Sequence, residues 1–205
     1  MTPYVVGITG ASGVVYGIRF VQVLTELGHD VHLVVSKAAR LVMEEKLGFS
    51  PKNLADGEAF RTFFESSHLQ RMALHANEDL AAPIASGSFP TRGMVIIPCS
   101  TGTLGCVAGG ISTNLIQRAA ECTLKEGRRL VIVPRETPVS AIQLENMLKL
   151  ARLGVRVLPA NPAFYAGAKT IQDLVDFVVG KTLDALEIPH GVYPRWTGRT
   201  VPTAA

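Results

Sequence analysis

Closely spaced small residues follow the first apolar run of the chain. Residues 4–9 lead into G-I-T-G-A-S-G at 7–13, after which a helical pattern begins. Such a segment places backbone N–H groups at a helix N-terminus, where the helix dipole favours an anion. The segment does not have the spacing of G-x-G-x-x-G, and it lacks the lysine of G-x-x-x-x-G-K-[ST]. By itself it is compatible with an anion site or with a tight packing turn.

The end of the second apolar run argues against one common ligand. An NAD enzyme places an acidic residue there to bind the ribose hydroxyls. This chain has Ser36 and Lys37 at that point, while Asp30 lies at the start of the run. An NAD site therefore loses support, whereas a phosphate, a flavin, or NADP held by Lys37 and Arg40 stays open. Ser36 could equally serve only to cap the helix that follows it.

Three later apolar runs end in polar or proline-marked loops. These loops read P-C-S-T-G-T at 98–103, P-R-E-T-P at 134–138 and P-A-N-P-A-F-Y at 159–165. Ligands of open parallel sheets bind beyond the carboxyl ends of the strands, so we expect these loops to share one crevice. Two sets of side chains would suit a phosphate there, namely the hydroxyls of Ser12, Ser100, Thr101 and Thr103 and the cations Arg118, Lys125 and Arg135.

The elements that position these loops follow an alternating pattern. Apolar runs at 4–9, 31–35, 94–98, 130–134 and 155–158 alternate with helical patterns at 13–28, 37–47, 104–126, 138–153 and 170–187. This alternation predicts a single-domain α/β fold, a Rossmann-like or flavodoxin-like parallel sheet with helices on both faces. Residues 50–92 interrupt the pattern and are predicted to be an insertion of loops with room for one helix. We predict a domain over 1–187 and an extended C-terminal arm over 188–205 that packs on a neighbouring subunit.

Composition narrows the class of protein further. Of the 205 residues, 47% are hydrophobic and only 18% are charged, against about 25% charged in a typical soluble domain. The deficit predicts apolar surface that is buried in a homo-oligomer. Lysine and arginine number 20 against 17 acidic residues, without runs of like charge, which argues against nucleic acid as a partner.

The cysteines, glycines and carboxylates allow predictions of where the protein is located and whether it binds a metal. Three cysteines without a C-x-x-C pair predict reduced thiols and a cytoplasmic protein. The uncharged stretch 93–117 contains Pro98 and several glycines, so we expect no membrane span there, and the first residues do not resemble a signal peptide. Asp173 and Asp176 are the only closely spaced aspartates, and the five histidines are scattered. No metal site is predicted.

Several blocks, in this order and spacing, resemble one known family. They are G-I-T-G-A-S-G at 7–13, V-S-K-A-A at 35–39, P-C-S-T-G-T-L at 98–104, R-A-A at 118–120, L-K-E at 124–126, V-P-R-E-T-P at 133–138 and F-Y at 164–165. Together they cover nearly the whole chain and resemble the UbiX-type flavin prenyltransferases. The related cysteine-decarboxylase flavoproteins share the first block but carry a P-x-M-N segment that this chain lacks.

This resemblance implies a transferase that joins the dimethylallyl group of dimethylallyl phosphate to N5 and C6 of reduced FMN without a metal. The product would be prenylated FMN, the cofactor of a partner UbiD-type decarboxylase in ubiquinone or aromatic-acid pathways. The resemblance also implies a dodecamer whose active sites lie at the junctions between subunits. Two other functions stay open for the same pocket, an FMN-binding carrier protein and an NADP-dependent reductase.

The resemblance also implies roles for individual residues. The FMN contacts would be Gly10, Ala11, Ser12, Ser36, Ser100, Thr101, Gly102, Thr103, Arg118 and Arg135, and the prenyl phosphate would be bound by Lys125, Arg135, Tyr165 and Lys181. Ser12, Lys125 and Glu136 would be catalytic, with Glu136 as the acid or base beside the departing phosphate. Fixed cations stabilise the leaving oxygens of a phosphate without a metal.

At two positions this chain departs from the family pattern. Lys46 stands where a glutamate near the flavin is usual, with Glu45 just before it, and Lys181 stands where arginine is commoner. A lysine keeps the positive charge but loses the bidentate geometry of arginine.

Overall fold

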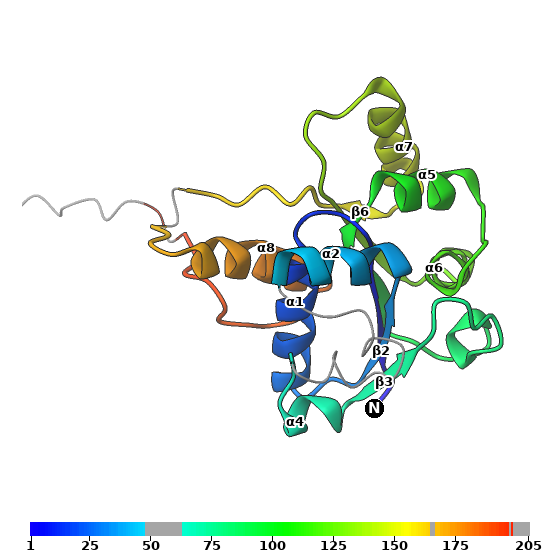
Figure 1. The fold of residues 1–205 in the computed structure, drawn as a ribbon, viewed down its shortest axis with the longest axis horizontal. Helices are drawn as coiled ribbons and strands as arrows, with labels where there is room; N and C mark the ends of the chain where they lie inside the picture. Colours follow the sequence, from blue (N-terminus) through cyan, green and yellow to red (C-terminus); the bar gives the residue numbers. More distant parts are fainter. Residues whose placement is uncertain (48–62, 165–166, 197, 199–205) are drawn as a thin grey trace, which may run out of the picture.

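The computed structural model describes residues 1–47, 63–164, 167–196 and 198, and its centre is a sheet of six strands (Figure 1). The strands are β1 (Tyr4–Ile8), β2 (Val31–Val35), β3 (Met72–His75), β4 (Gly93–Cys99), β5 (Arg129–Pro134) and β6 (Arg156–Val157). Their order across the sheet is β3-β2-β1-β4-β5-β6, and every neighbouring pair is parallel. All carboxyl ends of the strands therefore lie along the same edge of the sheet.

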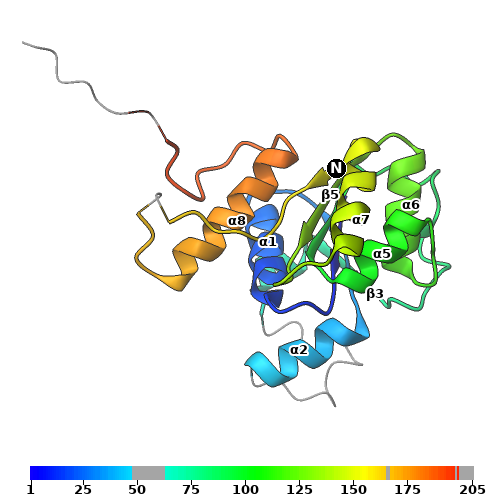
Figure 2. The ribbon, with the colours of Figure 1, turned by 90° about the horizontal axis from the view of Figure 1, so that it is seen from above.

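Helices cover both faces of the sheet, as Figure 2 shows. They are α1 (Val14–Glu26), α2 (Lys37–Leu47), α4 (Ser66–Leu69), α5 (Thr101–Gly109), α6 (Leu115–Lys125), α7 (Ala141–Arg152) and α8 (Ile171–Ala185), with a 3-10 turn η2 (Pro83–Ala85). In Figure 2, α1 and α8 lie on one side of the strands, and α5, α6 and α7 lie on the other. The predicted parallel α/β fold is confirmed.

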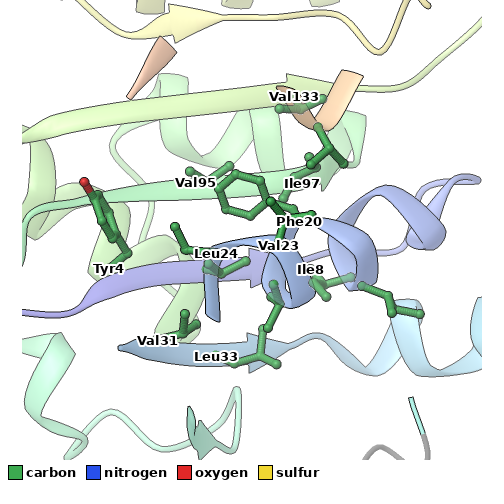
Figure 3. Close-up of a cluster of buried hydrophobic side chains, with 14 of the residues drawn as sticks. Tyr4, Ile8, Phe20, Val23, Leu24, Val31, Leu33, Val95, Ile97 and Val133 are labelled. Atoms are coloured by element: carbon green, nitrogen blue, oxygen red, sulfur yellow. The ribbon is translucent and has the colours of Figure 1, made fainter. Parts of the chain in front are cut away.

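Each face of the sheet has its own hydrophobic core. Figure 3 shows the core under α1, where the fully buried Phe20 and Leu24 pack on side chains of β1, β2, β4 and β5. The second core lies under α5, α6 and α7 and contains alternate residues of the same strands, such as Met94 and Ile96. Burying one such side chain stabilises a fold by roughly 1.5–3 kcal/mol. Strands buried on both faces give the unbroken apolar runs that the sequence contains.

The predicted helix over 104–126 is wrong, because the structure divides this segment into α5 and α6. Gly110 adopts a φ of 69° directly after α5 and ends that helix, since this left-handed conformation is easily adopted by glycine. Asn114 then begins α6, and its side chain accepts a hydrogen bond from the backbone N–H of Gln117 at 3.1 Å. The apolar pattern is continuous across this break and conceals it.

The predicted insertion over 50–92 contains a strand that the sequence analysis missed. β3 pairs in parallel with β2, from Met72 opposite Val31 to His75 opposite Val34. Two of its four residues, Ala73 and Leu74, are exposed, so no apolar run marks it. Residues 48–62 of the insertion lie outside the described part of the chain.

The beginning of the C-terminal arm packs against α8 of its own chain. His190, Tyr193 and Arg195 all donate hydrogen bonds to Asp184 on that helix. Farther along, Trp196 is 71% exposed. The contact of the arm over 188–205 with a neighbouring subunit stays a prediction.

The outer surface of α7 carries an unusual number of apolar side chains. Leu150 is the only buried residue of this helix. The exposed apolar side chains on it and at its two ends are Val139, Ile142, Leu144, Leu148 and Leu153. An apolar patch of this kind is typical of a surface that binds another protein.

Candidate functional site

Main-chain hydrogen bonds hold several loops together at the carboxyl edge of the sheet. The N–H of Ser36 donates to the carbonyl of Ile8 at 2.9 Å, that of Arg135 to Cys99 at 3.3 Å, and that of Ala160 to Pro134 at 3.0 Å. These bonds continue the strand pairing beyond the strands themselves. The loops that follow β1, β2, β4, β5 and β6 therefore lie side by side, while the single crevice expected for the loops at 98–103, 134–138 and 159–165 stays a prediction.

Thr9 is a buried residue that fixes two of these loops to each other. Its hydroxyl donates to the carbonyl of Pro98 at 2.9 Å and accepts from the N–H of Ser100 at 2.7 Å. The side chain is only 1% exposed, so both bonds are shielded from water. The sequence analysis missed this residue, and its only local signal is a polar side chain immediately after an apolar strand.

Two of the predicted hydroxyl contacts, Ser36 and Ser100, cap helices that begin at this edge. Ser36 accepts a hydrogen bond from the N–H of Ala39 at 3.1 Å, in the first turn of α2. Ser100 accepts from the N–H of Thr103 at 3.3 Å and donates to the hydroxyl of Thr103 at 3.1 Å. The hydroxyl protons of Ser36 and Thr103 remain available, because a hydroxyl that accepts a bond keeps its own donor. Such donors suit phosphate oxygens.

The glycines at this edge allow the backbone of the loops to approach closely. A Cβ on Gly10 would lie 2.4 Å from the Cβ of Ala38 in α2, and Gly13 has a φ of 109°. By contrast, a Cβ on Gly102 would meet no other atom within 4 Å. The segments 10–13 and 100–103 thus present backbone at the N-termini of α1 and α5, with open space beside Gly102. This arrangement fits the phosphate of a flavin nucleotide.

Two cavities lie at opposite edges of the sheet. One of about 740 Å³ opens at the edge where the strands begin. The other, of about 620 Å³, lies at the carboxyl edge beside the predicted residues Arg135 and Glu136. The second one is lined by Tyr16, Arg135, Glu136, Thr137, Leu144, Met147 and the prolines at 134, 138, 159 and 162, among others. Its volume is in the range of small-molecule sites. Arg135 and Glu136 follow β5 directly, and both are exposed.

Glu136 and Tyr16 give this cavity its proton-bearing groups. One carboxylate oxygen of Glu136 accepts from the N–H of Thr137 at 3.0 Å. Burial raises the pKa of the Tyr16 phenol, and the nearby Arg135 guanidinium opposes that rise. Tyr16 therefore stays protonated and can donate a hydrogen bond at neutral pH. Sequence reasoning missed Tyr16, although its place in the first turn after Gly13 could have indicated it.

The guanidinium of Arg118 is engaged in contacts with its own subunit. Its Nε donates to the carbonyl of Ala85 at 3.0 Å, and its Nη1 donates to Glu121 at 3.0 Å. These bonds connect α6 to the turn η2. The FMN contact expected for Arg118 stays a prediction.

Neither Lys125 nor Lys181 lines the cavity that contains Arg135. Lys125 is the last residue of α6 and is followed by the start of β5, and its Nζ donates to Glu126 at 3.0 Å. Lys181 lies in the C-terminal part of α8, close to Glu187, whose carboxylate is 2.8 Å from Arg129 at the start of β5.

Arg135 follows the last residue of β5, which has six residues, and a strand of that length spans roughly 17–20 Å. Because the two lysines lie outside the Arg135 cavity, the expected meeting of Lys125, Arg135 and Lys181 around one phosphate stays a prediction. Tyr165 and the side chains of Glu45 and Lys46 lie outside what the structure describes.

The described residues contain neither a metal-binding cluster nor a membrane-spanning helix. Within 1–47, 63–164, 167–196 and 198, histidine, cysteine and acidic side chains form no group of three or more that could hold a metal. Nor does any helix in that part of the chain have the length and apolar character to cross a membrane.

Comparisons with known proteins agree with the class of protein that this fold and site indicate. The family model described as Flavoprotein matches residues 2–183. The flavin prenyltransferase UbiX of Halalkalibacterium halodurans is 51% identical over 195 residues, which cover 94% of this chain and 92% of that protein. The chain thus has the fold of the α/β flavoproteins.

Two solved structures are similar over nearly their whole length. The crystal structure of AnUbiX in complex with FMN and dimethylallyl pyrophosphate is 39% identical, with a TM-score of 0.85 over 97% of this chain and 98% of that one. A dodecameric FMN-dependent UbiX-like decarboxylase from Escherichia coli O157:H7 is 40% identical, with a TM-score of 0.84 over 96% of this chain and 100% of that one. This chain belongs to the UbiX-type flavin prenyltransferases of the flavoprotein family.

Proposed function

We propose that this protein transfers the dimethylallyl group of dimethylallyl phosphate to N5 and C6 of reduced FMN, which yields prenylated FMN and phosphate. The observation that carries the proposal is the cavity at the carboxyl edge, where Arg135 and Glu136 lie in the loop beside those that begin α1 and α5. The related AnUbiX binds FMN and a dimethylallyl ester together. When bound, the reduced flavin supplies the nucleophilic nitrogen and carbon.

The residues of the loops would bind and orient the two substrates. Hydroxyls of Ser12, Ser36 and Thr103 and the backbone near Gly10 and Gly102 would hold the flavin nucleotide, in line with the helix N-termini there. The bond between the allylic carbon and oxygen breaks, and negative charge collects on the phosphate oxygens. Arg135 would stabilise this charge, while Glu136 exchanges a proton with the departing phosphate.

The phosphate site needs more than one subunit in this proposal. Neither Lys125 nor Lys181 lines the cavity of its own chain that contains Arg135, so neighbouring subunits would supply them to each cavity. The exposed apolar side chains of α7 would be covered in such an assembly. The dodecameric relative from Escherichia coli supports a dodecamer here as well.

The cellular setting follows from the product and from the thiols. Prenylated FMN would pass to a UbiD-type decarboxylase, because the prenyltransferase itself has no use for it. Cys99, Cys106 and Cys122 are all free thiols in the structure, which supports a cytoplasmic location. A labelled fusion observed in cells tests the location directly.

The decisive experiment mixes the protein with reduced FMN and dimethylallyl phosphate in the absence of oxygen. The flavin mass should increase by one five-carbon prenyl unit, and free phosphate should appear in equal amount. A parallel sample with dimethylallyl pyrophosphate establishes which ester is the substrate. An unchanged flavin would contradict the proposal and leave an FMN carrier, whereas NADPH oxidation without prenyl transfer would indicate a reductase.

A further inference from the structure

The densest polar cluster outside the cavity surrounds Asp184 near the end of α8. Its Oδ1 accepts from His190 Nε2 at 3.1 Å and from Arg195 Nη2 at 2.7 Å. Its Oδ2 accepts from the Tyr193 hydroxyl at 2.7 Å. We call residues 190–195 the anchor segment, since all three donors come from this short part of the arm, which turns back along α8 (Figure 2).

Local features show that the anchor segment is closely fitted to the helix. The side chain of His190 is 0% exposed, and its Nδ1 accepts from the N–H of Val192 at 3.2 Å. That bond leaves the proton on Nε2, which faces Asp184. A Cβ on Gly180 would lie 2.3 Å from the Tyr193 ring and 2.8 Å from His190. Only glycine at this position lets the segment lie against α8.

The same carboxylate is close to a cation that the proposed reaction uses. Lys181 Nζ forms an ion pair with Asp184 Oδ2 at 3.6 Å, a separation that is longer than a direct hydrogen bond. Burial alone would raise the pKa of Asp184, but hydrogen bonds from Arg195, Tyr193 and His190 lower it to about 2. The carboxylate is therefore ionised at neutral pH, and donors of the anchor segment occupy both of its oxygens.

These contacts matter because Lys181 and Asp184 are three residues apart on one helix. A lysine and a carboxylate at that spacing readily form a direct ion pair. Without the anchor segment, the ammonium of Lys181 would be the nearest donor to Asp184. A bound phosphate would then have to compete with the carboxylate for the same ammonium group.

We propose that the anchor segment is a positioning device that occupies Asp184 and so keeps Lys181 available for the prenyl phosphate. Arg195 is its main element, since its guanidinium neutralises the carboxylate at 2.7 Å. The inference rests on the proposed role of Lys181 in binding the phosphate. It extends that role to the arm, because residues 190–195 would influence substrate affinity indirectly, through Asp184 and Lys181.

The test compares Arg195→Gln with the wild-type dodecamer during prenyl transfer. KM for dimethylallyl phosphate should rise about three- to tenfold, in the range of exposed or charge-assisted pairs, while kcat changes little. Calorimetric titration of the FMN-loaded protein with dimethylallyl phosphate should show the same loss of affinity. Arg71→Gln is the matched control, because it removes an exposed pair with Asp30 at 3.1 Å that does not touch α8. Its KM should stay at the wild-type value.

The discriminating variant adds Asp184→Asn to Arg195→Gln. If Asp184 captures Lys181 when Arg195 is absent, removing the charge should return KM to within about twofold of wild type. If the segment serves only to anchor the arm, the double variant will be no better than Arg195→Gln, which would overturn the proposal.

Assembly and the reaction itself need separate checks. Should Arg195→Gln fail to assemble, as judged by light scattering, Tyr193→Phe removes one hydroxyl and should raise KM by a smaller factor, and an unchanged KM would count against the proposal. A wild-type protein without prenyl transfer contradicts the proposed function. An active wild type with an unaffected Arg195→Gln contradicts only this inference.

Discussion

The carboxyl edge of the sheet and the rest of the subunit carry different members of the predicted set of site residues. At the carboxyl edge, the loops after the strands provide hydroxyls, helix N-termini and a cavity in which Arg135 is the one lining cation among the described residues. Lys125 lies at the end of α6, toward the other edge, and Lys181 lies within α8; each is beside a carboxylate of its own chain. One subunit thus contains all three of these cations, but it does not bring them together in the cavity where a phosphate would bind. The difference supports our proposal that assembly completes the site.

The largest expected effect comes from substitutions that remove one predicted phosphate-binding cation at a time. Arg135→Ala and Lys181→Ala should each lower kcat/KM for dimethylallyl phosphate about 10- to 100-fold, since each removes a charged bond worth about 1.5–3 kcal/mol. Lys181→Ala should retain FMN, whereas Arg135→Ala should weaken both ligands. Oligomers that contain both variants in equal amounts should regain activity at about a quarter of their sites. A site shared by two subunits is intact only when one subunit supplies Arg135 and its neighbour supplies Lys181, and each condition is met about half of the time if the variants mix at random.

Restored activity in these mixed oligomers is measured after co-expression with two affinity tags. Oligomers that combine two differently tagged Arg135→Ala chains serve as the control and should stay inactive. If Arg135 and Lys181 acted from the same subunit, no mixture would contain an intact site. The absence of any recovery in confirmed mixed oligomers would therefore contradict the division of the site between subunits.

A smaller effect is expected when the carboxyl edge itself is loosened. Thr9→Val conserves shape but leaves the carbonyl of Pro98 and the N–H of Ser100 without their partner. The free energy of unfolding should fall by about 1–3 kcal/mol, the cost of leaving a buried polar group unpaired, and FMN affinity should fall with it. Denaturant unfolding measures the first quantity and flavin fluorescence titration the second. Thr9→Ser keeps the hydroxyl and should lose less of both.

A pair of histidines on the edge strand β3 and its neighbour β2 provides a pH test that does not change any predicted site residue. His75 Nε2 lies 2.9 Å from His32 Nδ1, and the two rings stack with centroids 4.9 Å apart. Burial lowers the pKa of both imidazoles, and the charge of His75 lowers that of His32 further, while Asp30 and Asp79 oppose the shifts. The unfolded chain therefore binds more protons than the folded one as pH falls through the unfolded pKa of about 6.5.

The stability contributed by these neutral histidines should be present above about pH 6.5 and decrease below it. Denaturant midpoints measured at several values between pH 7.5 and pH 5 give this slope. His75→Gln cannot take up a proton there, so its slope should be shallower than that of the wild type. Equal slopes for the two proteins would show that the pair does not contribute.

No effect is expected from removing divalent metal ions. In the proposed site, Arg135 and the lysines of neighbouring subunits would supply the positive charge that the departing phosphate requires, so a chelator should leave turnover unchanged. Prenyl transfer is measured before and after dialysis against the chelator, with magnesium added back to a second portion. A turnover that disappears on dialysis and returns with magnesium would contradict a site made of side-chain cations.

The sequence by itself determined the class of fold and the location of the loops. Parallel strands buried on both faces leave unbroken apolar runs, and the polar segments that follow each run must come to one edge of the sheet. The runs near Val6, Val95 and Val131 became β1, β4 and β5 as predicted. Strand β3 left no such run, because half of it faces solvent, and the break between α5 and α6 is hidden within a continuous apolar pattern.

Only the tertiary structure decided which side chains meet. Thr9 is 89 residues from Pro98 and 91 from Ser100 in the chain, so nothing local marks it as the residue that joins two loops. The sequence supplied the cations Lys125, Arg135 and Lys181 but not their positions. A helix that crosses back over a parallel sheet runs opposite to the strands, and it carries its last residues to the far edge. For that reason Lys125 and Lys181 lie away from Arg135 in one chain.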